Sequence, residues 1–218
     1  HAIIVLWSLI VLRRRDIGIA FRDEHSRIVN PGIMWRLCKI GAPIATSGFL
    51  FSLSYMILSR FITAFGYGPL AALGLGHRIE GLSYYVTVGF SFAASILVGQ
   101  NLGAGKPERA EKAVWLSVLY ISIFLFFVSL VFFFFGGSIV RFFIDDPEAI
   151  KEGASYLRII AIFEIFLGFE IVLEGAFSGA GNSLPPMLIS VPLTWLRIPL
   201  ALLFAHGLGM GSLGIWLA

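Results

Sequence analysis

The sequence predicts an all-α, polytopic membrane protein, that is, a bundle of transmembrane helices. Of its 218 residues, 58% are hydrophobic and only 13% are charged, whereas an average soluble domain is about 45–50% apolar and about 25% charged. Apolar runs of bilayer-spanning length, roughly 20 residues, alternate with polar or Gly/Pro segments, and positive charge alternates between successive loops. This composition excludes a disordered chain, a basic nucleic-acid-binding module and an ordinary soluble enzyme.

The first forty residues are predicted to contain no complete span. Residues 2–12 are apolar but too short to cross a bilayer, so residues 1–12 are interpreted as the end of a transmembrane helix. Residues 13–40 are predicted to be a basic loop. Its Arg13–Arg15 run lies directly at the helix end, which favours an anchor that contacts anionic lipid over a nucleic-acid site.

Residues 41–218 are predicted to hold five full spans and the start of another. The first span, 41–64, ends at a Gly-Tyr-Gly-Pro sequence. The second lies within 70–102 and is longer than a bilayer requires, so it either tilts or begins with a turn near Gly74 and Gly76. The third, 114–140, has no charged residue.

The fourth and fifth spans carry unusual residues for a bilayer interior. The fourth, 154–177, contains three glutamates, and the fifth, 184–206, contains four prolines and Arg197. Only helices and closed barrels satisfy their backbone groups in lipid, and alternating barrel segments are absent, so these spans are helices. Proline within a span is tolerated where a cavity or a neighbour satisfies the freed backbone groups, which favours a transporter.

The loop charges predict an orientation. Lysine and arginine are concentrated in loops 13–40 and 103–113, whereas residues 65–76 have no charge and residues 141–152 are mainly acidic. Cytoplasmic loops carry the excess of positive residues. Loops 13–40 and 103–113 are therefore predicted to face the cytoplasm, in a multi-pass protein of the cytoplasmic (inner) membrane.

Depth along the helices indicates which charges lie inside the membrane. At about 1.5 Å of rise per residue, Glu164 lies roughly 16 Å from the outer end and Arg197 roughly 20 Å from the cytoplasmic end. They share a layer, which predicts a structural Arg197–Glu164 ion pair. Glu170 and Glu174 lie four positions apart on one helix face with no obvious partner. A carboxylate there is expected to exchange protons or bind a monovalent cation.

Two further features depend on where helices begin and meet. If the second span begins near Leu70, Glu80 lies about 15 Å inside it, but if it begins near Gly81, Glu80 is an edge residue. The small-residue spacings at 99–103 and 175–179 are of the kind that lets membrane helices approach closely.

Several segments together resemble one family. The run Val98-Gly99-Gln100-Asn101-Leu102-Gly103-Ala104-Gly105-Lys106-Pro107-Glu108-Arg109-Ala110 is similar to the signature of the multidrug and toxic compound extrusion (MATE) transporters. Matches at 39–44, 69–74, 76–82, 174–182 and 197–200 extend the resemblance over essentially the whole chain. It implies a twelve-helix fold of two six-helix lobes, with this chain covering most of the C-terminal lobe and requiring the N-terminal lobe as its partner.

The resemblance also implies a function and candidate residues. Members export amphipathic, often cationic small molecules in exchange for H⁺ or Na⁺, and many carry a carboxylate in the middle of helix 7, where residues 49–55 here have none. No cofactor beyond the coupling ion, no catalytic residue and no certain metal site is expected. The cation-coupling candidates are Glu170, Glu174, Glu164 and Glu80. The candidate substrate-cavity aromatics are Phe51, Tyr55, Tyr84 and Tyr85.

Three alternatives to drug efflux can be compared with it. A flippase for lipid-linked oligosaccharide or polysaccharide would belong to the same wider superfamily and would favour basic residues facing the core, but only Arg197 and Arg78 qualify, so it ranks lower. A membrane-embedded enzyme would need a nucleophile or metal cluster at one depth, and the sequence contains none. A structural or channel subunit would not need the glutamates of the fourth span.

Overall fold

The computed structural model describes residues 31–218, so the predicted helix end 1–12 and most of loop 13–40 lie outside the described residues. The chain divides into two units, His1–Lys39 and Ile40–Ala218. Of the first unit the structure describes the opening turns of helix α2 (Pro31–Ile62). This helix begins well before the predicted residue 41, so the end of the predicted loop is helical. Proline is favourable at a first helical position, where its missing N–H leaves no bond unmade.

The described residues contain helices and no strand, which confirms the all-α prediction. After α2 the elements are η2 (Thr63–Phe65), α3 (Tyr67–Gly103), α4 (Pro107–Phe143), α5 (Pro147–Gly179), α6 (Leu184–Leu202), the π-helical turn η3 (Leu203–Gly207) and α7 (Ser212–Leu217). Helix α3 runs through Gly74 and Gly76 without a break. The longer form of the second span is therefore correct, and Glu80 lies well inside the helix.

Short turns with identifiable stop and start residues separate the long helices. Between α3 and α4, Gly105 has a φ of +69°, a conformation that favours glycine, and Pro107 opens α4. Before α5, the side chain of Asp146 accepts a hydrogen bond of 2.8 Å from the backbone N–H of Ala149. This N-cap satisfies one of the donors that a helix start leaves free.

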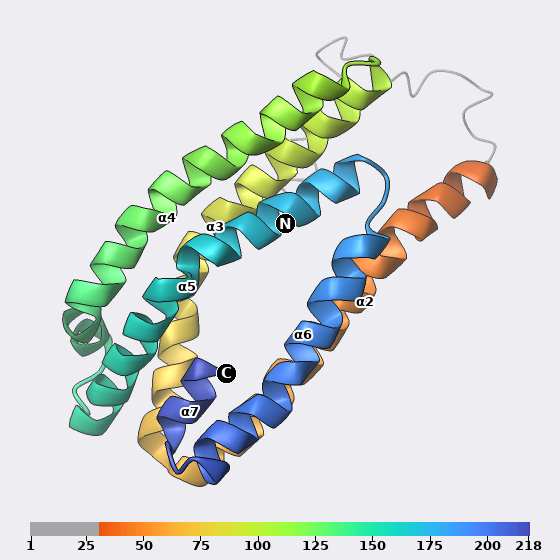
Figure 1. Cartoon of the computed structure of the whole chain (residues 1–218). Coiled ribbons are helices and arrows are strands. Elements are labelled where there is room, and N and C mark those ends of the chain that lie inside the picture. The colour runs from red at the N-terminus through yellow and green to blue at the C-terminus, as the bar shows by residue number, and fades with distance from the viewer. Residues whose placement is uncertain (1–30) are drawn as a thin grey trace, which may run out of the picture. The chain divides into compact units, whose positions relative to one another are not determined.

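Helices α3, α4 and α5 pack side by side as one bundle, with α5 against both of the others (Figure 1). The approach of α3 to α5 is close because Gly175 faces Ser91. A Cβ at Gly175 would lie 2.4 Å from the Ser91 carbonyl oxygen, and the Ser91 hydroxyl donates a 2.8 Å bond to the Ile171 carbonyl. This confirms the close packing predicted for 175–179.

The other long helices, α2 and α6, are joined by hydrogen bonds within Ile40–Ala218. The hydroxyl of Ser183, at the start of α6, donates to the Ile40 carbonyl at 2.6 Å. Further along, the hydroxyl of Ser54 donates to the Thr194 carbonyl at 3.4 Å. The short helix α7 is held to α5, because Glu152 accepts bonds from Ser212 (2.8 Å) and the indole of Trp216 (3.3 Å).

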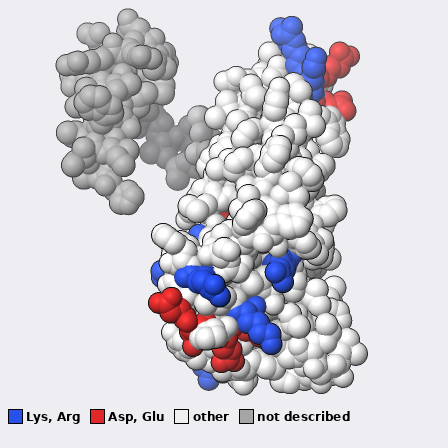
Figure 2. Space-filling view, turned by 90° about the vertical axis from the view of Figure 1, so that its left-hand side faces the viewer, with Lys and Arg blue, Asp and Glu red and all other residues white. Residues whose placement is uncertain are grey.

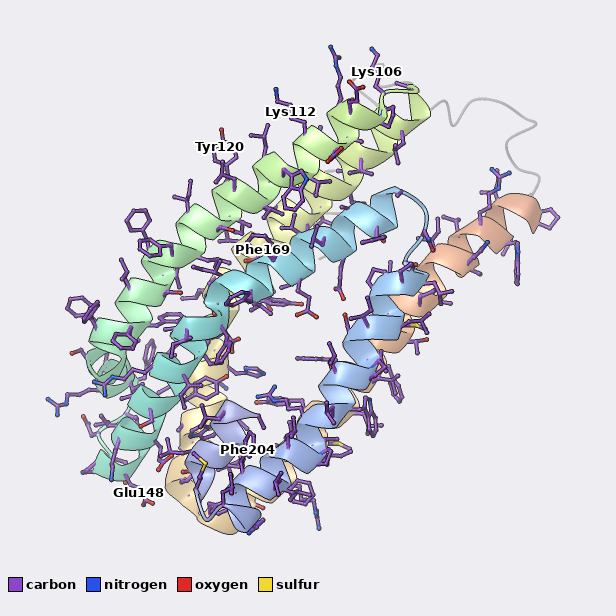
Figure 3. The ribbon with its side chains drawn as sticks, in the orientation of Figure 1. Lys106, Lys112, Tyr120, Glu148, Phe169 and Phe204 are labelled. Atoms are coloured by element: carbon purple, nitrogen blue, oxygen red, sulfur yellow. The ribbon has the colours of Figure 1, made fainter. Side chains whose placement is uncertain are left out.

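Four helical segments of the described chain are long and apolar enough to cross a membrane: Pro31–Phe65, Tyr67–Gly103, Pro107–Phe143 and Leu184–Gly207. Helix α5 does not meet that criterion of composition, but it packs along α3 and α4 and therefore crosses with them. Charged side chains gather at two ends of the face in Figure 2, with a nearly uncharged band between them. Figure 3 places Lys106 and Lys112 at one end of the bundle and Glu148 at the other. The protein is a multi-pass membrane protein.

Candidate functional site

A cavity of about 390 Å³ lies among α3, α5, α6 and α7. It is lined by Glu80, Ile160, Phe163, Glu164, Phe166, Leu167, Glu170, Arg197, Trp216, Leu217 and Ala218. Figure 3 shows side chains of α5 and α6 projecting into the space between these two helices. Three carboxylates and one guanidinium thus share an otherwise apolar hollow within a membrane-crossing bundle.

Glu164 is the most buried of these ionisable groups, with 1% of its surface exposed. Its Oε1 accepts a hydrogen bond from the Ser83 hydroxyl of α3, while its Oε2 has no partner. The same Ser83 hydroxyl also lies 2.8 Å from the Glu80 carbonyl oxygen, one turn earlier in α3. A buried carboxylate oxygen without a partner is costly unless it gains a proton or a cation.

Glu80 is held at the wall of the same cavity by two side chains. Its Oε2 lies 3.1 Å from Nδ1 of His77, one turn away on α3, and accepts a 3.0 Å hydrogen bond from the Tyr156 hydroxyl of α5. His77 and Glu80 form the one pair of acidic and basic side chains within 4.0 Å recorded for residues 31–218. Both bonds end on the same carboxylate oxygen, Oε2.

Glu170 and Glu174 are in different surroundings although they share a helix face. Glu170 is exposed and lines the cavity. Glu174 does not line it and is half-buried, accepting a 2.9 Å bond from the Ser190 hydroxyl of α6. The expectation that Glu174 has no partner was therefore wrong, because α6 turns back against α5 and brings Ser190 to it.

The predicted Arg197–Glu164 ion pair does not form in this structure. Both side chains line one cavity, as their common depth predicted, but they are not within the 4.0 Å of an ion pair. Nε of Arg197 is buried without a partner, and Glu164 bonds to Ser83 instead. Depth along a helix fixes the layer of a residue, whereas contact also depends on helix rotation and spacing.

The four aromatic candidates do not line this cavity. Phe51, Tyr84 and Tyr85 are 50%, 44% and 74% exposed in this chain, and Tyr55 stacks on His77 with ring centroids 4.4 Å apart. Their role in substrate binding stays a prediction. The aromatic side chains that do line the cavity are Phe163, Phe166 and Trp216.

Several of the residues that build this site were not predicted from the sequence. Phe163 and Phe166 lie on either side of Glu164 in the sequence, and this proximity could have predicted them as neighbours of its carboxylate. In the same way, the position of His77 one helical turn before Glu80 could have predicted their contact. Ser83 and Tyr156 gave no such signal, because their partners are distant in sequence.

The fold and the cavity define a class of protein: a polytopic helical membrane protein with ionisable groups facing a cavity among its helices. Its sequence matches the MatE family over residues 43–203. The chain belongs to the MatE family, as the resemblance predicted.

Curated relatives carry transporter names. The probable multidrug resistance protein NorM of Thermotoga maritima is 29% identical over 182 residues, which are 83% of this chain and 39% of that protein. The FAD transporter of Shewanella oneidensis is 26% identical over 200 residues, 91% of this chain and 43% of that protein. The chain thus spans about two fifths of the length of these relatives.

Solved structures support the fold. The crystal structure of MATE in complex with MaD5 superposes with a TM-score of 0.77 at 21% identity, covering 83% of this chain and 41% of that one. A MOP superfamily transporter from Pyrococcus furiosus superposes with a TM-score of 0.76 at 21% identity, covering 83% and 40%. These matches agree with a helical membrane bundle that forms part of a larger fold.

Proposed function

We propose that the full-length protein is a secondary active exporter of amphipathic, cationic drug-like compounds in the cytoplasmic membrane, driven by inward movement of H⁺ or Na⁺. The observation that carries this proposal is Glu164. It is an almost fully buried acid at a cavity wall, with one oxygen bonded to Ser83 and the other unpartnered. Relatives named as multidrug resistance proteins support the same conclusion.

The surroundings of Glu164 favour binding and release of a cation. A charged group at mid-membrane costs at least about 2.5–3.5 kcal/mol on insertion scales, so such groups face protein or water and mark ion pathways. Glu80 and Glu170 line the same cavity, and carboxylate oxygens bind a hard cation such as Na⁺ or accept a proton. Exchange with a cationic substrate follows because the same negative charge attracts both.

Apolar and aromatic walls support the second half of the proposal. Phe163, Phe166 and Trp216 offer ring surfaces to the apolar body of an amphipathic compound, and aromatic faces also attract a cationic group. In a two-lobe transporter, the other lobe would complete this surface.

The test uses the full-length protein in proteoliposomes, with ethidium export driven by an imposed H⁺ or Na⁺ gradient. Glu164→Gln is expected to remove gradient-driven export almost completely, because the amide keeps the size of the side chain but cannot carry the charge. Glu170→Gln and Glu174→Gln measure the share of the other two glutamates of α5. Ser155→Ala, on the exposed side of α5, is the matched control and is expected to leave export unchanged. Unchanged coupling in Glu164→Gln would contradict the proposal.

One observation favours a second candidate, a flippase or exporter for an anionic, lipid-linked or nucleotide-like substrate. Arg197 lines the cavity with its Nε buried and unpaired, and a guanidinium suits phosphate groups. The relative named as an FAD transporter is consistent with it. Deleting the intact gene separates the candidates: lost drug tolerance supports efflux, whereas altered envelope precursors or extracellular flavin support the second.

A further inference from the structure

Four side chains from three helices meet beside the cavity and connect it to helix α2. Tyr55 of α2 stacks on His77 of α3, with ring planes 11° apart. Nδ1 of His77 lies 3.1 Å from Oε2 of Glu80, and the Tyr156 hydroxyl of α5 donates to the same oxygen at 3.0 Å. We call Tyr55, His77, Glu80 and Tyr156 the clasp.

The backbone of α3 is shaped to admit the ring of Tyr156. A Cβ at Gly76 would lie 2.3 Å from Cδ1 of Tyr156, so only glycine leaves room for the ring to reach Glu80. Tyr156 is itself 2% exposed and packs edge-on against Trp216 of α7, with centroids 5.1 Å apart. The ring of Tyr156 is therefore held by packing as well as by its hydrogen bond to Glu80.

Three serine hydroxyls of α2 form hydrogen bonds away from the bundle of α3, α4 and α5. Ser54 donates to Thr194 of α6, and Ser52 and Ser59 donate to carbonyls of α2 itself. The Tyr55–His77 stack is a direct side-chain contact between α2 and α3.

We propose that the clasp makes the position of α2 depend on whether Glu80 carries a free negative charge. This inference rests on the proposed ion-driven export and adds positioning roles for His77 and Tyr55. An ionised Glu80 accepts a charge-assisted bond from Nδ1–H of His77, and such bonds are roughly twice as strong as neutral ones. That bond holds the imidazole ring parallel to Tyr55.

When Glu80 takes up a proton or Na⁺ from the cavity, its charge is neutralised and the bond to His77 weakens. The imidazole is then free to leave the stacked orientation, and α2 loses its contact with α3 through Tyr55, while the apolar packing of Leu58 and Ile62 remains. The other ionisable groups around the clasp are Glu164 of α5, Arg197 of α6 and the two tyrosine hydroxyls. Glu164 shares the cavity with Glu80, so an ion entering the cavity reaches both carboxylates.

The experiment measures the distance between α2 and the bundle in the full-length protein. Spin labels at Ser52→Cys of α2 and Phe135→Cys of α4, in a background without other cysteines, report it in nanodiscs. Spectra are recorded at alkaline and acidic pH, with and without sodium. The wild-type pair is expected to shift to a second distance population when the ion is supplied. Glu80→Gln is expected to show that second population in all conditions.

Two variants separate the stack from the hydrogen bond. His77→Phe keeps a ring against Tyr55 without a donor to Glu80, and Tyr55→Leu keeps the donor without the stack. Both are expected to abolish the ion-dependent shift. Gly76→Ala is expected to do the same by displacing Tyr156, whereas Gly74→Ala, where a Cβ meets nothing within 4 Å, is the matched control with wild-type behaviour.

The outcomes are distinguishable from those of the proposed function. An ion-dependent shift that survives in His77→Phe or Tyr55→Leu overturns the clasp, and so does a wild-type protein in which the ion causes no shift. If Glu164→Gln abolishes gradient-driven export while these variants keep the wild-type shift, the export proposal stands and the clasp fails.

Discussion

At the scale of single residues, the buried acid Glu164 weakens the structure that holds it. Glu164 is 1% exposed, and one of its two oxygens has no partner. Leaving a buried polar group unsatisfied costs about 1–3 kcal/mol, whereas an apolar group of similar shape can be neutral or stabilising. Selection for packing alone would not place a glutamate at this position.

Glu164→Leu is therefore expected to leave the full-length protein as stable as the wild type or more stable by about 1–3 kcal/mol, while removing ion-driven export. Ser83 does not become an orphan in this variant, because its hydroxyl lies 2.8 Å from the Glu80 carbonyl oxygen. Thermal unfolding of the purified protein, followed by tryptophan fluorescence, checks the stability. A clearly lowered midpoint would mean that Glu164 makes a stabilising contact.

At the scale of helices, the close approach of α3 to α5 depends on Gly175, which has no side chain. A Cβ at Gly175 would lie 2.3 Å from the Ser91 hydroxyl and 2.4 Å from its carbonyl oxygen. Gly175→Ala forces the helices apart and is expected to destabilise the protein by about 1–3 kcal/mol, the usual cost of overpacking. Gly89→Ala in α3 is the control, since a Cβ there meets nothing within 4 Å. Equal thermal midpoints for the two variants would refute this account.

The same helices show what sequence could predict. The uncharged run 114–140 predicted α4 because apolar length alone specifies a span. The starts of α2 and α3 were placed too late, at 41 and near 70, where the helices begin at Pro31 and Tyr67. The residues before 41 were assigned to a basic loop, and the Gly-Tyr-Gly-Pro sequence at 66–69 was taken as a stop signal, but proline and glycine are tolerated in the first turns of membrane helices.

For the site, the helical rise per residue predicted that Glu164 and Arg197 lie at the same depth in the membrane, and both do line one cavity. Depth alone could not predict which side chains are in contact, because contacts depend on helix rotation and on partners far along the chain. Tyr156 reaches Glu80 across 76 positions of sequence, and no local pattern records such a pair. The coupling roles of Glu170, Glu174, Glu164 and Glu80 stay predictions.

At the scale of the whole molecule, the arrangement of the helices agrees with the loop charges. The basic segment at Lys106 and Lys112 and the acidic segment at Glu148 lie at opposite ends of the bundle (Figure 3). The positive-inside rule assigns the first end to the cytoplasm. In the structure, the basic and the acidic segments lie at opposite ends of the bundle. The loop charges predict which of these ends faces the cytoplasm.

Reporter fusions to the full-length protein test that orientation. Alkaline phosphatase folds to an active enzyme only outside the cytoplasm, so a fusion after Gly105 is expected to be inactive and a fusion after Asp145 active. A fusion after Asn182 is expected to be inactive as well, because α5 returns the chain to the first side. The physical reason is that Lys106, Arg109 and Lys112 resist translocation, whereas the segment around Asp145 and Glu148 carries no such excess. Activity after Gly105 with inactivity after Asp145 would invert the whole orientation, and with it the direction of the proposed export.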